Sequence, residues 1–486
     1  MKNIQDFIFR LKDLGINITL KNDDLKISAP KNVLTSDIID DIKSLKLDII
    51  EFFKKSTSEG VYESYTLLKQ ATIKDYYLLS SAQRRQYILQ QMNLDSIAYN
   101  ISHTIKLGND IKKNKVEEVF HQLIARHESF RTSFEVRDEI PDQCVHEKVE
   151  FKIEEFLIEK SEVENTQNEF IRVFDLSKAP LLRVAIVEIE DENSLLMIDM
   201  HHIISDGVSL DILQQEFQSL YLGKELSPLS LQYKDYSEWQ NSLEQQENIK
   251  KQEDYWLKKF SDEIPVVNLP LDYSRPQIQS YEGATVNFVL SKKETEDLKL
   301  MVKENGLTLY MGILSVYTIL LSKLSAQEDI VVGSPIVGRN HADLENIVGM
   351  FVNTLCIRNE VRGEETIKEF ISGLKQTTLE SFENQDFQFE DLVDKISVER
   401  DTSRNPIFDV AINLLNQAEY SRDISGINSE NLIHIKGVSK FDLTLIAIDY
   451  DDQLLLSFEY CTKLFKSETI DRFITYFKQI VNQLPN

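Results

Sequence analysis

Residues 195–207 read Leu-Leu-Met-Ile-Asp-Met-His-His-Ile-Ile-Ser-Asp-Gly. The apolar run predicts a buried strand, and the turn after it leads into a helix that we expect to begin around Ser209. His201 and His202 therefore lie at the end of a strand, a common place for catalytic groups. Because adjacent side chains on a strand point in opposite directions, one of the two histidines can face a given cavity.

Two other interpretations of the histidine pair stay open at this point. A lone histidine at a strand end is more often structural, because imidazole readily satisfies buried hydrogen bonds, but the pair followed by Asp206 and Gly207 favours a functional site. A metal site is the second interpretation. Tetrahedral zinc takes three or four protein ligands, and the sequence offers no fourth ligand at a typical spacing. We therefore expect no metal.

Composition excludes several classes of partner. The 486 residues include 80 acidic and 54 basic side chains, a net charge of −26, which repels nucleic acid and anionic membrane surfaces. The N-terminus has no signal-peptide pattern, and no apolar run reaches the ~18 residues that span a bilayer. Cys144, Cys356 and Cys461 are far apart and odd in number, which is typical of free thiols in a reducing compartment. We expect a cytoplasmic protein that binds neither nucleic acid nor a membrane.

Alternating segments predict a mixed α/β (α+β) architecture. Strands over 182–189 and 194–200 are interleaved with helices over 115–127 and 210–221. A stretch rich in Gln, Glu and Lys at 242–253, followed by prolines between Pro265 and Pro276, predicts a division into two lobes near residue 265. One large domain with a surface helix there is the alternative.

A small unit precedes these lobes. Apolar residues at helical spacing over 4–14 end at Gly15, alternation around 16–20 and 25–27 predicts a β-hairpin, and a second amphipathic helix follows over 38–53. The order is thus helix, hairpin, helix, in a unit that we place at 1–55. The polar segment after it indicates a linker over 56–74.

The histidine segment resembles a known family. His201 to Gly207 match the HHxxxDG signature of condensation domains in nonribosomal peptide synthetases. Further segments resemble other blocks of that family in the same order: 81–85, 126–134, 233–240, 348–354, 384–387 and 400–406. The resemblance covers residues 75–486 almost completely.

This resemblance implies a fold and a reaction. The fold would be two lobes, 75–264 and 265–486, each similar to chloramphenicol acetyltransferase, forming a V-shaped pseudo-dimer with the active site in a tunnel between them. In the reaction, the amine of an acceptor aminoacyl thioester attacks an upstream donor acyl or peptidyl thioester. Donor and acceptor carrier proteins would present both on phosphopantetheine arms, so the chain itself would bind no cofactor.

The resemblance also assigns roles to single residues. His202 matches the family's second histidine and is our candidate for the active site, as a general base or as a group that positions the amine; His201 accompanies it. Asp206 is expected to pair with Arg339 and hold the loop in shape. Gly207 either lets the backbone approach the substrate and face the oxyanion, or is a plain turn glycine. Asn353 either binds substrate or ties down a strand end.

The small N-terminal unit resembles the tubulysin-type N-terminal docking domain, in its element order and in residues 25–31. An exposed hairpin can bind an extended peptide by strand addition, so the expected partner is the C-terminal docking peptide of an upstream synthetase. Lys21, Lys26 and Lys31 are candidates to attract an acidic tail. Lysines on an edge strand also serve simply to block aggregation.

Rival functions remain. An epimerisation domain of the same superfamily would use the same histidines to move an α-proton, although the block around Asn353 and the docking unit favour condensation. A heterocyclisation domain would carry paired aspartates in place of His201 and His202. A module that recruits carriers or partners without catalysis is the alternative from another class, and a turnover assay would identify it.

Overall fold

The computed structural model describes residues 17–21, 24–28, 42–43, 45–46, 68–107, 112–190, 194–396, 401–415, 437–450 and 453–484. Contacts divide the chain into a unit over Met1–Leu67 and a unit over Leu68–Asn486. Residues 68–74, which the sequence analysis assigned to the linker, thus belong to the larger unit.

The first unit contains the predicted hairpin. Strand β1 (Asn17–Lys21) pairs antiparallel with β2 (Asp24–Ser28), and Ile18 lies opposite Ile27, which confirms the hairpin. Three predicted features lie outside the described residues: the helix over 4–14, most of the helix over 38–53, and Lys31. The side chains of Lys21 and Lys26 also lie outside them, so their predicted role in docking stays a prediction.

The N-terminal half of the larger unit, here called the first lobe, mixes strands and helices. Its elements are β3 (Tyr77–Leu78), α4 (Ser81–Met92), β4 (Asn100–Lys106), α5 (Lys113–Arg126), η1 (Glu128–Arg131), β5 (Thr132–Arg137), β6 (Ile140–Val145), β7 (Glu154–Ile158), η2 (Lys160–Glu162), α6 (Val163–Phe170), β8 (Leu182–Ile189), β9 (Leu195–His201), η3 (His202–Ile204), α7 (Gly207–Tyr221), α8 (Tyr233–Gln240) and α9 (Leu243–Lys259). The predicted strands correspond to β8 and β9 and the predicted helices to α5 and α7, which confirms the mixed architecture.

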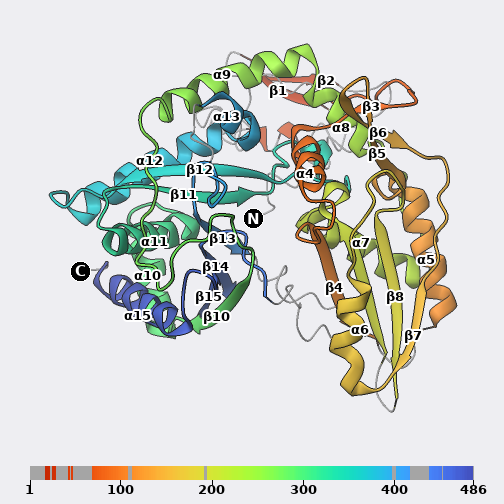
Figure 1. Cartoon of the computed structure of the whole chain (residues 1–486). Helices are drawn as coiled ribbons and strands as arrows, with labels where there is room; N and C mark the ends of the chain where they lie inside the picture. The colour runs from red at the N-terminus through yellow and green to blue at the C-terminus, as the bar shows by residue number, and fades with distance from the viewer. Residues whose placement is uncertain are drawn as a thin grey trace. The chain divides into compact units, whose positions relative to one another are not determined.

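The main sheet of this lobe has the order β4-β9-β8-β7, and β3-β6-β5 forms a smaller one. Helices α5 and α7 pack against one face of the main sheet, and α6 covers the other (Figure 1). Both faces of β8 and β9 are therefore buried, which explains why these strands read as nearly continuous apolar runs. This burial holds the end of β9, and with it the histidine pair, in place.

The second lobe is built around a mixed sheet in the order β10-β15-β14-β13-β11-β12 (Figure 1). Its elements are β10 (Gly283–Val289), α10 (Lys292–Glu304), α11 (Leu309–Ser325), β11 (Asp329–Ile336), η4 (Ala342–Leu344), β12 (Asn353–Glu360), α12 (Ile367–Glu383), α13 (Phe389–Lys395), β13 (Val410–Leu415), β14 (Leu443–Tyr450), β15 (Gln453–Cys461) and α15 (Ser467–Gln483). Helix α9 lies before the predicted boundary at 265, yet its Trp256 belongs to the core of this lobe.

Helix α11 is deeply buried in that core. Ile313, Leu314, Val316 and Tyr317 have no exposed surface, so apolar residues occupy all sides of the helix, as expected for a helix inside a core. Within the described residues no single helix has the length and hydropathy of a membrane span; only α10 and α11 taken together pass that test, across a bend of 107°.

Candidate active site

The end of β9 turns through η3 directly into α7. The Asp206 carboxylate accepts the backbone N–H of Ser209 at 2.7 Å and so caps the helix. Because the cap is Asp206, α7 begins at Gly207, slightly ahead of the start predicted around Ser209. The capped turn places His201 at the last position of the strand and His202 at the first position of η3.

His201 is fully buried within the first lobe. Its Nδ1 accepts the backbone N–H of Ile203 at 3.0 Å, so Nε2 carries the proton and donates to Gln90 Oε1 at 3.3 Å. Burial first, and then the neighbouring His202, lowers the pKa of His201 to about 3. A neutral ring with both nitrogens engaged stabilises the turn after β9.

His202 has a different environment. Its backbone N–H donates to the Tyr99 carbonyl at 2.8 Å, and its side chain is only partly buried. Nδ1 lies 2.9 Å from the Ser205 carbonyl, which can only accept, so Nδ1 carries the proton and Nε2 keeps its lone pair. Burial first, and then the charge of Lys440, lowers the pKa of His202 to about 4, against an opposing effect of Asp206. The ring is a neutral hydrogen-bond acceptor at pH 7.

Asp206 and Arg339 join the histidine loop to the second lobe. Arg339 Nη2 lies 3.0 Å from Asp206 Oδ1, and the two side chains are 4% and 1% exposed. Asp206 Oδ2 also accepts the backbone N–H of Phe351 at 3.2 Å, and the Arg339 guanidinium stacks 4.0 Å from the centre of the Phe351 ring. The carboxylate is thus occupied by the ion pair with Arg339 that the family resemblance implies.

Further contacts fasten the same loop. Ser209 Oγ lies 3.0 Å from both the carbonyl oxygen and the amide nitrogen of Gly349, and the Tyr233 hydroxyl donates to the Met350 carbonyl. A Cβ on Gly349 would come within 1.8 Å of the Tyr233 ring. This close approach of backbone to ring explains the glycine. The start of α7 is therefore tied to residues 349–351 of the second lobe.

Gly207 is the first residue of α7 and is exposed. A Cβ built on it would meet no heavy atom within 4 Å. Protein packing therefore does not require glycine here, and the two predicted roles of Gly207, close substrate approach or a plain turn, stay open.

Asn353 begins β12 and is buried. Its Nδ2 donates to the carbonyls of Gln385 and Phe387 at 2.8 and 3.0 Å, and its Oδ1 accepts the backbone N–H groups of Thr354 and Phe389. The side-chain amide holds the loop over 385–389 against the strand. This geometry is the one expected for tying down a strand end, and substrate binding by Asn353 stays a prediction.

A buried charge next to the site escaped the sequence analysis. Asp199 on β9 accepts Asn100 Nδ2 at 3.0 Å, Ser102 Oγ at 2.7 Å and Arg183 Nη1 at 3.0 Å. Burial dominates and raises the pKa of Asp199 to about 6. The signal was present in the sequence: a lone carboxylate within an apolar strand, at the position whose side chain shares a face with His201.

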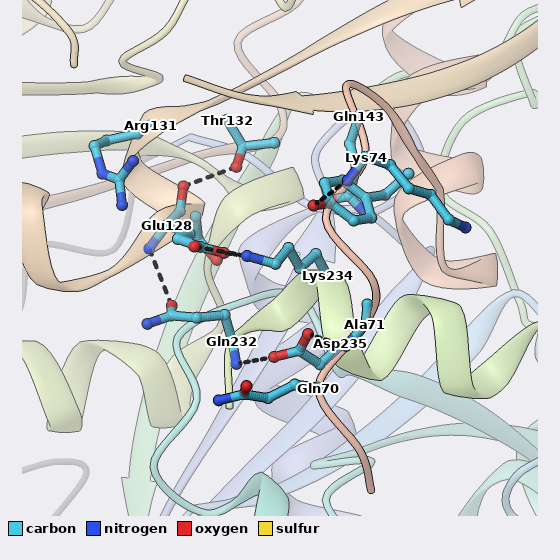
Figure 2. A network of polar contacts seen from close by, with 12 residues as sticks. Gln70, Ala71, Lys74, Glu128, Arg131, Thr132, Gln143, Gln232, Lys234 and Asp235 are labelled. Carbon is cyan, nitrogen blue, oxygen red and sulfur yellow. Dashed lines mark hydrogen bonds and ion pairs between the residues drawn. The ribbon is translucent and has the colours of Figure 1, made fainter. Parts of the chain in front are cut away.

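Two of the sequence blocks meet beside α8. Lys234 Nζ lies 2.5 Å from Glu128 Oε2, and Gln232 Oε1 accepts the Glu128 backbone N–H at 3.1 Å (Figure 2). The segment before β3 also follows α8, since the Ala71 N–H donates to Asp235 Oδ1 at 2.8 Å (Figure 2). Helix α8 thus connects the start of the larger unit with the Tyr233 contact to residues 349–351.

Comparisons with known proteins cover nearly the whole chain. The family model "Condensation domain" matches residues 73–485, and "TubC N-terminal docking domain" matches residues 4–55. Bacitracin synthase 3 of Bacillus licheniformis is 44% identical over 88% of this chain, and bacitracin synthase 2 of the same organism is 42% identical over 99%. The matches span 7% and 18% of those relatives, so this chain corresponds to a small part of them.

A solved structure is similar in fold over the whole length of the chain. The EpoB cyclization-docking bidomain of a nonribosomal peptide synthetase from Sorangium cellulosum is 17% identical, with a TM-score of 0.69, over 100% of this chain and 99% of that one. At this identity the likeness concerns the fold.

Proposed function

Since this chain belongs to the condensation-domain family of nonribosomal peptide synthetases and carries a TubC-type docking domain, we propose that it joins an upstream donor acyl or peptidyl thioester to an acceptor aminoacyl thioester. The C–N bond forms as the C–S bond breaks, and the proton lost by nitrogen ends on the sulfur of the donor's arm. Both arms are phosphopantetheine on carrier proteins, and the chain binds no metal or cofactor of its own.

The contact between His202 Nδ1 and the Ser205 carbonyl is the observation on which the proposed chemistry depends. With Nδ1 donating to the Ser205 carbonyl, Nε2 is the atom that can accept a hydrogen bond from the acceptor amine. His202 has a pKa of about 4, whereas an α-ammonium has a pKa of about 8, and four pKa units correspond to about 5 kcal/mol. Such a histidine does not deprotonate an ammonium, but it aligns a neutral amine. We therefore assign His202 a positioning hydrogen bond to the nucleophile.

The docking unit indicates how the donor arrives. We propose that the β1–β2 hairpin receives the C-terminal peptide of an upstream synthetase by strand addition. We place the reaction in the cytoplasm, where the free thiols of Cys144, Cys356 and Cys461 match a reducing compartment.

Single-turnover amide formation between two loaded carrier proteins, followed by mass spectrometry, tests this function. We expect product from the native chain and a loss on His202→Ala of roughly 10- to 100-fold, at or below the low end of the 10² to 10⁴ that general-base catalysis contributes. His121→Ala, which changes an exposed histidine on α5, is the matched control. No amide from the native chain across several donor and acceptor pairs, or inversion of the donor's α-carbon on chiral analysis, would contradict the proposal.

A further inference from the structure

A lysine of the second lobe, Lys440, lies near Tyr99 of the first lobe. Lys440 precedes β14, and its backbone carbonyl accepts Gln279 Nε2 at 3.0 Å and Asn405 Nδ2 at 3.4 Å, which fixes the loop that carries it. Its Nζ lies 5.1 Å from the centre of the Tyr99 ring in the first lobe. Tyr99 is the residue whose carbonyl accepts the His202 backbone N–H. A lysine of the second lobe therefore lies next to Tyr99, the residue whose carbonyl binds the His202 backbone.

The charges around Lys440 come from both lobes. Burial first, and then Arg85 of α4, lowers the pKa of Lys440, while Glu459 of β15 opposes that change. Arg85 itself pairs with Glu390 of α13 at 2.7 Å. Several titratable or charged groups interact electrostatically with Lys440, Tyr99 or His202. The first lobe contributes Arg85, Asp206 and His201, and the second contributes Tyr281, Glu390 and Glu459. The charge of Lys440 in turn lowers the pKa of His202.

The condensation reaction requires the acceptor amine in its neutral form. The acceptor must present a free amine, yet an α-ammonium is mostly protonated at pH 7, since its pKa is about 8. His202 is too weak a base to remove that proton. A like charge near a site disfavours the charged form of a group that binds there. An ammonium near the point where the amine binds would therefore favour the neutral amine.

We propose that Lys440 is a positioning residue of the reaction: its ammonium, held against Tyr99 beside His202, makes this side of the site unfavourable for a second cation and so selects the acceptor as the free amine. The inference rests on the proposed condensation activity. Lys440 would act through its charge, whereas His202 acts through a hydrogen bond.

The pH dependence of a single turnover distinguishes this role from a structural one. With saturating loaded carriers between pH 6 and 9, Lys440→Gln should move the acid limb of the rate profile upward by roughly one pH unit, a tenfold loss near pH 6.5 that disappears by pH 9. Lys440→Arg keeps the charge and should restore the native profile. Lys463→Gln, which removes an exposed lysine paired with Glu282 in the same lobe, is the matched control. A loss by the same factor at every pH, or an unchanged profile, would overturn the proposal.

A second readout does not depend on turnover. In full-length protein with labelled histidine, assigned with His202→Gln, the His202 imidazole should titrate roughly one unit higher in Lys440→Gln than in the native chain. An unchanged titration refutes the electrostatic role even if amide forms. If the native chain forms no amide but the His202 titration shifts as expected, the condensation function is contradicted. The electrostatic effect of Lys440 on His202 is then still supported.

Discussion

Replacing Asp206 tests whether the carboxylate serves the fold or the chemistry. Asp206→Ala leaves the guanidinium of Arg339, which is 4% exposed, without its counter-charge, and breaking a buried pair in this way costs about 3–5 kcal/mol. The same change removes the cap of α7, a further loss of about 1 kcal/mol. The free energy of unfolding should therefore fall by about 4–6 kcal/mol, a large share of the 5–15 kcal/mol typical of a native protein.

Urea unfolding of the full chain, followed by tryptophan fluorescence and circular dichroism, measures this loss. Asp206→Asn keeps a side chain that caps helices well and removes only the charge, so it should be less destabilising than Asp206→Ala. The double variant Asp206→Ala with Arg339→Met should lose less stability than the sum of its single changes, because the buried cation is gone. If Asp206→Ala costs less than about 1 kcal/mol while amide formation disappears, the carboxylate acts on the chemistry and the structural assignment is wrong.

Two other predictions concern the same loop. Gly207→Ala meets no steric obstacle in the protein, so its thermal unfolding should match the native chain; if substrate approaches the backbone closely, amide formation should fall at least tenfold, whereas full activity would identify a plain turn glycine. His201 has a folded-state pKa of about 3 against an unfolded value of about 6.5, so the unfolded state binds the extra proton and stability falls as pH drops below 6.5. Between pH 6.5 and 4.5 the native chain should lose about 2–3 kcal/mol more than His201→Gln, and equal losses in the two proteins would disprove a buried neutral His201.

Local patterns in the sequence predicted the elements that position the site. The hairpin of β1 and β2, the buried strands β8 and β9, and helices α5 and α7 follow from alternation and helical spacing over short windows. The start of α7 was placed too late because a side-chain cap, Asp206, extends the helix toward the histidines. The order of short blocks along the chain was enough to indicate the family.

Residue patterns alone thus predict the mixed architecture, the family and the loop that carries the candidate active site. Packing of the chain buries His201 inside the first lobe and leaves His202 with a lone pair on Nε2. It also decided that Asn353 is engaged by the loop over 385–389 and that Lys440 stands beside Tyr99. The physical reason is that a tautomer, a pKa and a through-space charge depend on burial and on neighbours far away in the chain, and those neighbours exist only once the lobes have packed.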